Sequence, residues 1–323
     1  QKPDYIKLIL SMVEFTYFPQ GGGEDQIMPS EVDMLTPGQY ASKVVQMMLI
    51  HLRGKLDPII PGIIQLLFKK LARVIALEGE IARSTEDEED KEYYADTARY
   101  TKTVLLETIC LAVYYNPVLF LSVCSRLKQV TQLFKLWIDS MKSLCSRQES
   151  LGISALGMTS LALVPQHQVP PELKGKGILQ LMSTNVQQLI ELKKMEDNEE
   201  EDSDGTESED ETQEFEDVDA TKDAINEKHM EEIRGLAQKI RDVIHEDMKA
   251  GQHDEYLDEF LEPLYKLDKF QFFAETMDKF PKINPQAYQD WIKVMNGQQR
   301  QVVQQLISLG RKRAQESKSN EED

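Results

Sequence analysis

The chain has 323 residues, of which 41% are hydrophobic, and its formal net charge at neutral pH is −19. The length and apolar content are sufficient for a large buried core. The excess of carboxylates argues against direct binding of nucleic acid, because contact with phosphates requires concentrated Lys and Arg. The three cysteines, an odd number without CxxC spacing, indicate reduced thiols in the cytosol or nucleus.

Helical patterning dominates the chain, and the sustained alternation of a β-strand is absent. Apolar residues recur at helical spacing in five stripes, which lie at residues 45–52, 60–75, 178–190, 233–244 and 302–307. Prolines stand near the expected helix starts, where a missing N–H costs nothing. We expect about ten to twelve helices of about 10 to 24 residues each. The most apolar stretch is too short to span a membrane, so we expect no membrane partner.

This succession of helices and short turns predicts an all-α fold, specifically an α-solenoid of HEAT-type antiparallel helix pairs. A single large helical bundle is the alternative. We expect the chain to be a fragment of a longer protein, because helical pattern begins at its first residues. The expected regions are HEAT-type helices at 1–195, a disordered acidic loop at 196–219, further HEAT-type helices at 220–317 and a disordered tail at 318–323.

The acidic loop holds fifteen carboxylates, no Lys or Arg, and only two large apolar side chains, Phe215 and Val218. It carries all but four of the nineteen net negative charges. So little apolar surface cannot offset the entropy lost on folding. We therefore expect this polyanionic loop to bind Lys- and Arg-rich proteins in a salt-dependent way. The alternative is a solvated insertion without function. The candidate cargo-binding residues are Glu196, Asp197, Glu199, Glu200, Glu201, Asp202, Asp204, Glu207, Glu209, Asp210, Glu211, Glu214, Glu216, Asp217 and Asp219.

Two residues of the loop are candidate phosphorylation sites. Thr206 and Ser208 each have a carboxylate three positions further on, at Glu209 and Glu211. This is the pattern that an acid-directed kinase requires. Phosphorylation there would deepen the negative potential of the loop.

No segment carries the residues of a catalytic site. The stretch at 152–156 lacks the final Gly of a nucleophile elbow, and residues 245–249 have Lys where a zincin helix has its second His. Residues 200–211 match most positions of a calcium-binding EF-hand loop, but they begin with Glu where that loop has Asp. We therefore expect no enzymatic activity, no cofactor and no specific metal site.

Three segments around the acidic loop carry a family resemblance. They are "ETICLAVYYNPVLFLSVC" (107–124), "SRQESLGISALGMTSLALVP" (146–165) and residues 261–313, which contain "NPQAYQ" followed by a Gln- and Arg-rich final helix. Together they resemble the C-terminal part of nuclear import receptors of the importin-β superfamily, in the branch of importins seven and eight and their fungal relatives. The acidic insertion falls where that branch has one.

The resemblance implies a superhelix of HEAT repeats that carries basic cargo, such as ribosomal proteins or histones, into the nucleus. It implies shuttling between cytoplasm and nucleus through weak contacts with Phe-Gly nucleoporins of the nuclear pore. It also implies release of cargo by Ran-GTP, which docks on N-terminal repeats that this chain does not contain. The alternative from another functional class is an acidic-loop chaperone for histones or ribosomal proteins that does not itself cross the pore.

The C-terminal end departs from the family pattern. Animal members use a Phe-Gly-bearing tail to pair with a second importin, whereas this chain ends in "RAQESKSNEED". The basic cluster at 311–313 precedes that ending. We expect it to form the last turn of the final helix, where the helix dipole favours cations.

Overall fold

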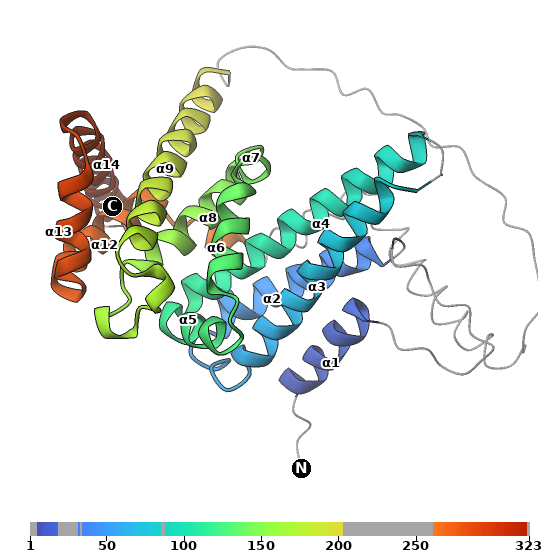
Figure 1. Ribbon diagram of the computed structural model, residues 1–323. Coiled ribbons are helices and arrows are strands. Elements are labelled where there is room, and N and C mark those ends of the chain that lie inside the picture. Colours follow the sequence, from blue (N-terminus) through green and yellow to red (C-terminus); the bar gives the residue numbers. More distant parts are fainter. Residues whose placement is uncertain (1–4, 19–31, 33, 85–87, 203–260, 322–323) are drawn as a thin grey trace, which may run out of the picture. The chain divides into compact units, whose positions relative to one another are not determined.

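The computed structural model describes residues 5–18, 32, 34–84, 88–202 and 261–321 of the chain. These residues form twelve α-helices and two short 3₁₀-helices, without a strand among them (Figure 1). The all-α class predicted from the sequence is confirmed. The α-helices are α1 (Tyr5–Tyr17), α2 (Leu35–His51), α3 (Ile60–Ile81), α4 (Glu88–Tyr115), α5 (Pro117–Arg126), α6 (Val130–Asp139), α7 (Met141–Leu144), α8 (Gln148–Leu161), α9 (Lys176–Asp202), α12 (Lys269–Ile283), α13 (Pro285–Val294) and α14 (Gly297–Glu321); the 3₁₀-helices are η1 (Gln166–Gln168) and η2 (Pro171–Leu173).

Local capping residues define several of the helix starts. The Asn116 side chain accepts a hydrogen bond from the Leu119 backbone N–H (3.1 Å), and a proline follows directly at the first position of α5. The same Asn-Pro pair opens α13, where Asn284 accepts from the Ala287 N–H (3.3 Å). Such caps satisfy backbone donors that have no partner inside the helix. The Asn-Pro dipeptides of the sequence therefore mark boundaries between helices.

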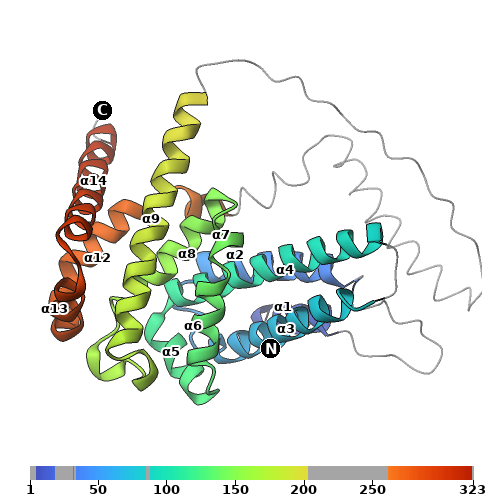
Figure 2. The same ribbon diagram turned by 45° about the horizontal axis from the view of Figure 1, so that its top comes forward.

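Two groups of helices, one around α4 and one around α12, are joined through α8. α4 packs against α2 and α3 and also against α8; α8 in turn contacts α12, which packs closely on α14. In both views, α9 lies between α6 and α8 on one side and α12–α14 on the other (Figures 1 and 2). Most of the extensive contacts thus join helices that are separated by one or more helices in the chain, as in α2 with α4, α4 with α8 and α12 with α14.

The predicted apolar stripes form much of the core. In α3, the stripe from Ile60 to Val74 is buried, whereas Ile75 at its end is 38% exposed. Val303, Leu306 and Ile307 of α14 are likewise buried. The stripe at 233–244 lies outside the described residues. Among the described helices, none alone has the length and apolar character to span a bilayer, and the one pair that passes together, α4 with α5, is bent by 118°.

Polar side chains connect several helices inside this core. Ser154 of α8 accepts hydrogen bonds from Trp137 Nε1 of α6 (2.7 Å) and from Gln188 Nε2 of α9 (2.5 Å). Asn185 Nδ2, also on α9, donates to the Thr159 hydroxyl of α8 (2.8 Å). All of these side chains are buried, where an unpaired polar group would be costly. The bonds therefore favour one register of α9 against α8.

Two boundaries and the position of the basic cluster at 311–313 differ from the sequence prediction. The helix before the acidic segment does not end at residue 195, because α9 continues through Asp202. The tail predicted from residue 318 is helical through Glu321 in α14. The basic residues at 311–313 consequently lie well inside α14 rather than in its last turn. Arg313 instead makes tertiary contacts, because it forms ion pairs with Glu196 and Asp268 outside its own helix.

A glycine determines how closely α14 approaches α12. A Cβ atom at Gly310 would lie 2.1 Å from the Phe270 carbonyl oxygen, far inside van der Waals contact. Changing Gly310→Ala should therefore force the two helices apart and lower the free energy of unfolding by about 2–3 kcal/mol. Urea denaturation followed by circular dichroism would measure this loss.

Gly62 in α3 provides the matched control, because nothing lies within 4 Å of a Cβ atom built there. Gly62→Ala should leave the free energy of unfolding unchanged or raise it by about 0.5 kcal/mol through reduced chain entropy. Equal stability of the two alanine variants would contradict the close packing of α12 and α14.

Candidate functional site

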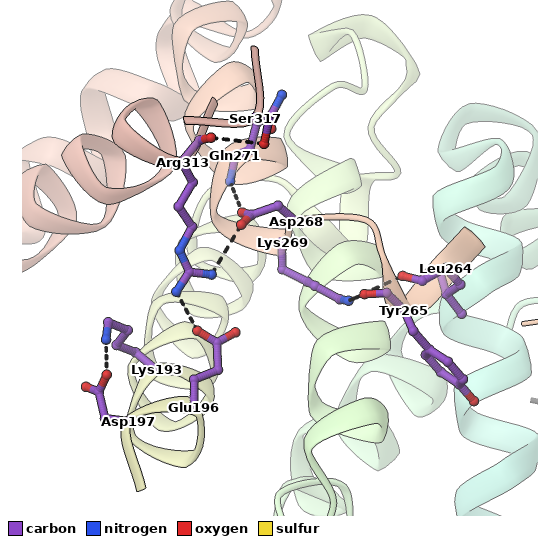
Figure 3. A network of polar contacts seen from close by, with 10 residues as sticks. All are labelled: Lys193, Glu196, Asp197, Leu264, Tyr265, Asp268, Lys269, Gln271, Arg313 and Ser317. Atoms are coloured by element: carbon purple, nitrogen blue, oxygen red, sulfur yellow. Dashed lines mark hydrogen bonds and ion pairs between the residues drawn. The ribbon is translucent and has the colours of Figure 1, made fainter. Parts of the chain in front are cut away.

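The acidic segment, by which we mean residues 196–219, begins on the last turns of α9. Its first two carboxylates, Glu196 and Asp197, have neighbouring cations (Figure 3). Asp197 forms an ion pair with Lys193 one turn earlier on the same helix. Glu196 is reached by Arg313, which comes from α14. The start of the acidic segment is thus held by charge pairs within the fold.

Arg313 binds two carboxylates from different parts of the chain. Its Nη2 lies 2.6 Å from Glu196 Oε2, and its Nη1 lies 3.2 Å from Asp268 Oδ2. Figure 3 shows the guanidinium group between the two acids. The side chains of Arg313, Glu196 and Asp268 are 27%, 21% and 23% exposed, so water is only partly excluded. We call these three residues the Arg313 clasp.

The elements that carry the clasp are fixed independently. Asp268 is the N-cap of α12, and its Oδ1 accepts a hydrogen bond from the Gln271 N–H (2.6 Å). The Arg313 guanidinium carbon lies 4.6 Å from the centre of the Phe270 ring, a cation–π contact. The close approach at Gly310 places Arg313, one turn later on α14, beside both groups. Helix packing and the contact with Phe270 therefore position the guanidinium group independently of Glu196.

A second cation next to the clasp has a different role. Lys269 Nζ donates to the backbone carbonyls of Leu264 (3.3 Å) and Tyr265 (2.8 Å). Burial lowers the pKa of Lys269, although the nearby charges of Asp268, Glu196 and Glu149 act in the opposite direction. For Arg313, burial alone would lower the pKa, but the hydrogen bond and charge of Glu196, together with Asp268, raise it overall. Arg313 is therefore the cation that pairs with these carboxylates.

The predicted cargo-binding residues divide into two groups. Residues 196–202 continue α9 as helix, which corrects their assignment to a disordered loop. Extending an existing helix costs less than starting a new one, because each added residue gains a backbone hydrogen bond. The helix α9 therefore continues into the acidic run. Residues 203–219, including the phosphorylation candidates Thr206 and Ser208, lie outside the described residues. The first and third positions of the calcium-loop pattern, Glu200 and Asp202, belong to α9.

The described residues also bear on other chemistry. Burial raises the pKa of Cys110, and it raises the pKa of Cys124 to about 12. Burial and the charge of Glu191 raise the pKa of Cys145. These thiols therefore stay protonated at neutral pH and are weak nucleophiles. Within the described part of the chain, no three His, Cys, Asp or Glu side chains are grouped so that they could hold a metal ion.

One further surface feature is apolar. A groove of about 240 Å³ lies between α3 and α6. Phe68, Leu71 and Ile75 line it from α3, and Leu133 and Leu136 line it from α6. Ile75, which continues the stripe of α3 and is partly exposed, belongs to this groove. Sequence reasoning placed Ile75 in the core stripe and did not predict the groove, because the facing residues lie far along the chain.

The clasp makes a stability prediction. Arg313→Gln leaves the partly buried carboxylates of Glu196 and Asp268 without their shared cation, so it should lower the free energy of unfolding by about 1–2 kcal/mol. The matched control is Arg311→Gln. Arg311 lies 2.7 Å from Asp278 in a pair whose side chains are 59% and 58% exposed, and its loss should cost at most about 0.5 kcal/mol.

Urea titrations at low and high salt would measure both variants. The difference between them should shrink at high salt, because salt screens partly exposed charges. A loss no greater for Arg313→Gln than for Arg311→Gln would show that the clasp contributes nothing to stability.

Comparison with known proteins does not assign the chain to a family. No family model, no curated protein and no solved structure matches the chain. A functional proposal therefore depends on the residues themselves and on the described helices.

Proposed function

We propose that this chain is the C-terminal region of a nuclear import receptor that binds basic cargo proteins, partly through its acidic segment at 196–219. The observation that carries the proposal is the concentration of charge. Fifteen carboxylates without a single Lys or Arg lie in one run, at 196–219, of an all-α chain whose remaining residues have a net charge of only −4, the difference between −19 and −15. Ribosomal proteins and histones are the cargo class that such a polyanion favours.

Electrostatics would give this binding a particular character. Each exposed ion pair is worth at most about 1 kcal/mol, so a single carboxylate would capture nothing. Many carboxylates on one segment act together, and cargo binding should then be fast and strongly salt-dependent. Release requires a competing state with a different affinity for the cargo. In the proposed receptor, Ran-GTP supplies that state by binding to N-terminal repeats.

We further propose that the helices are HEAT-type repeats of an α-solenoid. The packing order supports this, because α4, α8, α12 and α14 contact one another in sequence. In a solenoid each repeat buries its apolar face mainly against its neighbours. An extended array would offer the acidic segment and shape-specific helix surfaces to the same cargo.

The groove between α3 and α6 is the surface that best suits a Phe-Gly nucleoporin. Its lining is mainly aliphatic and aromatic, and Gln129 and Gln132 add amide groups to it. An inserted Phe ring would contact apolar side chains, while the amides could hydrogen-bond the peptide backbone. The contact would be weak and reversible, as passage through the pore requires.

The acidic segment gives the first functional test. The variant replaces every Asp and Glu in residues 203–219 by Asn and Gln, which keeps chain length and leaves α9 and the Arg313 clasp intact. A titration with linker histone should show affinity reduced by at least about tenfold at low salt, and by less as salt rises. Unchanged histone affinity, with unchanged helicity, would refute the cargo role of the segment.

The groove gives the second test, and it separates a receptor from a chaperone that does not cross the pore. Ile75→Glu should abolish binding of a Phe-Gly repeat peptide, because it places a carboxylate in the apolar groove. Val294→Glu is the control, since Val294 on α13 is 62% exposed and lies outside the groove. Nuclear magnetic resonance of labelled peptide would measure both. Histone binding without any Phe-Gly binding by the wild-type chain would favour the chaperone.

A further inference from the structure

The Arg313 clasp joins the two flanks of the stretch that lies outside the described residues. Glu196 precedes residues 203–260 on α9, and Asp268 follows them at the start of α12. One guanidinium group from α14 pairs with both carboxylates. The clasp therefore connects the beginning of the acidic segment to the C-terminal helices.

We propose that Arg313 is a built-in competitor of basic ligands, and that a Lys- or Arg-rich ligand opens the clasp by taking over the Glu196 carboxylate. This inference rests on the proposed function, because it concerns regulation of the same acidic segment. Opening breaks the ion pair between the end of α9 and α14. Binding of a basic protein is thereby coupled to the attachment of the acidic segment to the C-terminal helices.

The chemistry of the clasp supports the competition. Arg313 makes with Glu196 the same charge-assisted contact that an arginine of a ligand would make. The carboxylate is 21% exposed, so a ligand can approach it from solvent. Arg313 would keep its Asp268 and Phe270 contacts when Glu196 is lost, which limits the cost of the exchange. A partly exposed ion pair is weak enough to be replaced.

The surrounding contacts restrict what can move. Arg311 on α14 pairs with Asp278 on α12, and the close approach at Gly310 holds these two helices together independently of Glu196. Asp268 stays hydrogen-bonded to the first turn of α12. Opening of the clasp therefore breaks the ion pair between α9 and α14 and leaves the pairing of α12 with α14 unchanged.

Affinity measurements test the competition directly. The probe is a fluorescent oligoarginine peptide, titrated at low salt into the wild-type chain and into Arg313→Gln and Arg311→Gln. Both variants lose one positive charge, so any effect of net charge is the same in each. Only Arg313→Gln removes the competitor, and it should bind the probe about threefold more tightly than Arg311→Gln, a factor typical of one partly exposed ion pair.

Hydrogen exchange measured by mass spectrometry tests the clasp itself. Without ligand, Arg313→Gln should speed amide exchange at residues 190–198 by about fivefold relative to the wild-type chain, and Arg311→Gln should leave it unchanged. Glu196→Gln opens the clasp from the α9 side and spares the Asp268 pair. It should give the same increase, which keeps the test valid if Arg313→Gln does not fold.

The outcomes distinguish the two proposals. If oligoarginine binds but Arg313→Gln and Arg311→Gln have equal affinities, the competition is overturned and cargo capture stands. Exchange at 190–198 that is the same in all variants would overturn the clasp as a link between α9 and α14. If the wild-type chain does not bind oligoarginine at low salt, the proposed function fails as well.

Discussion

Burial of α4 is the constraint on which the rest of the structure depends. Its first half is polar, but residues 103–113 are buried without a break. A helix stretch that is buried on every side must be enclosed by other helices. α2 and α3 cover part of α4, α5 packs at its end, and α8 covers the remainder. Because each fully buried Leu, Ile or Val side chain contributes about 1.5–3 kcal/mol relative to exposure, this enclosure is the main stabilising feature of the described helices.

The enclosure continues through α8, and small residues make it possible. Residues 150–161 of α8 are buried on all sides. A Cβ atom at Gly157 would lie 2.8 Å from the Cys110 carbonyl oxygen of α4, so glycine permits the close approach of these two helices. On the far side, Lys269 of α12 packs over Gly152, and Ser154 bonds to α6 and α9. α8 thereby connects the helices on both sides of the acidic segment.

The candidate site uses this rigid frame for a weak interaction. Packing at Gly310 and capping by Asp268 fix the position of Arg313, while the contact with Glu196 depends on charge and on partial shielding from water. Strong core packing and a replaceable ion pair thus lie within a few residues of each other. This combination is consistent with the proposal that basic ligands bind and leave while the helices stay folded.

The sequence by itself determined the helical class, the apolar stripes and the location of the acidic charge. Periodicity and Asn-Pro caps act within a few residues, so their signal is local and readable without a structure. Tertiary structure decided where the helix before the acidic run ends, what Arg313 contacts and how α3 and α6 form a groove. Arg313 and Glu196 are 117 residues apart, and the reading of residues 311–313 as a helix terminus was wrong because no local pattern encodes such a pair. Distant contacts depend on how closely whole helices pack, which here follows from glycines whose role is invisible until their neighbours are in place.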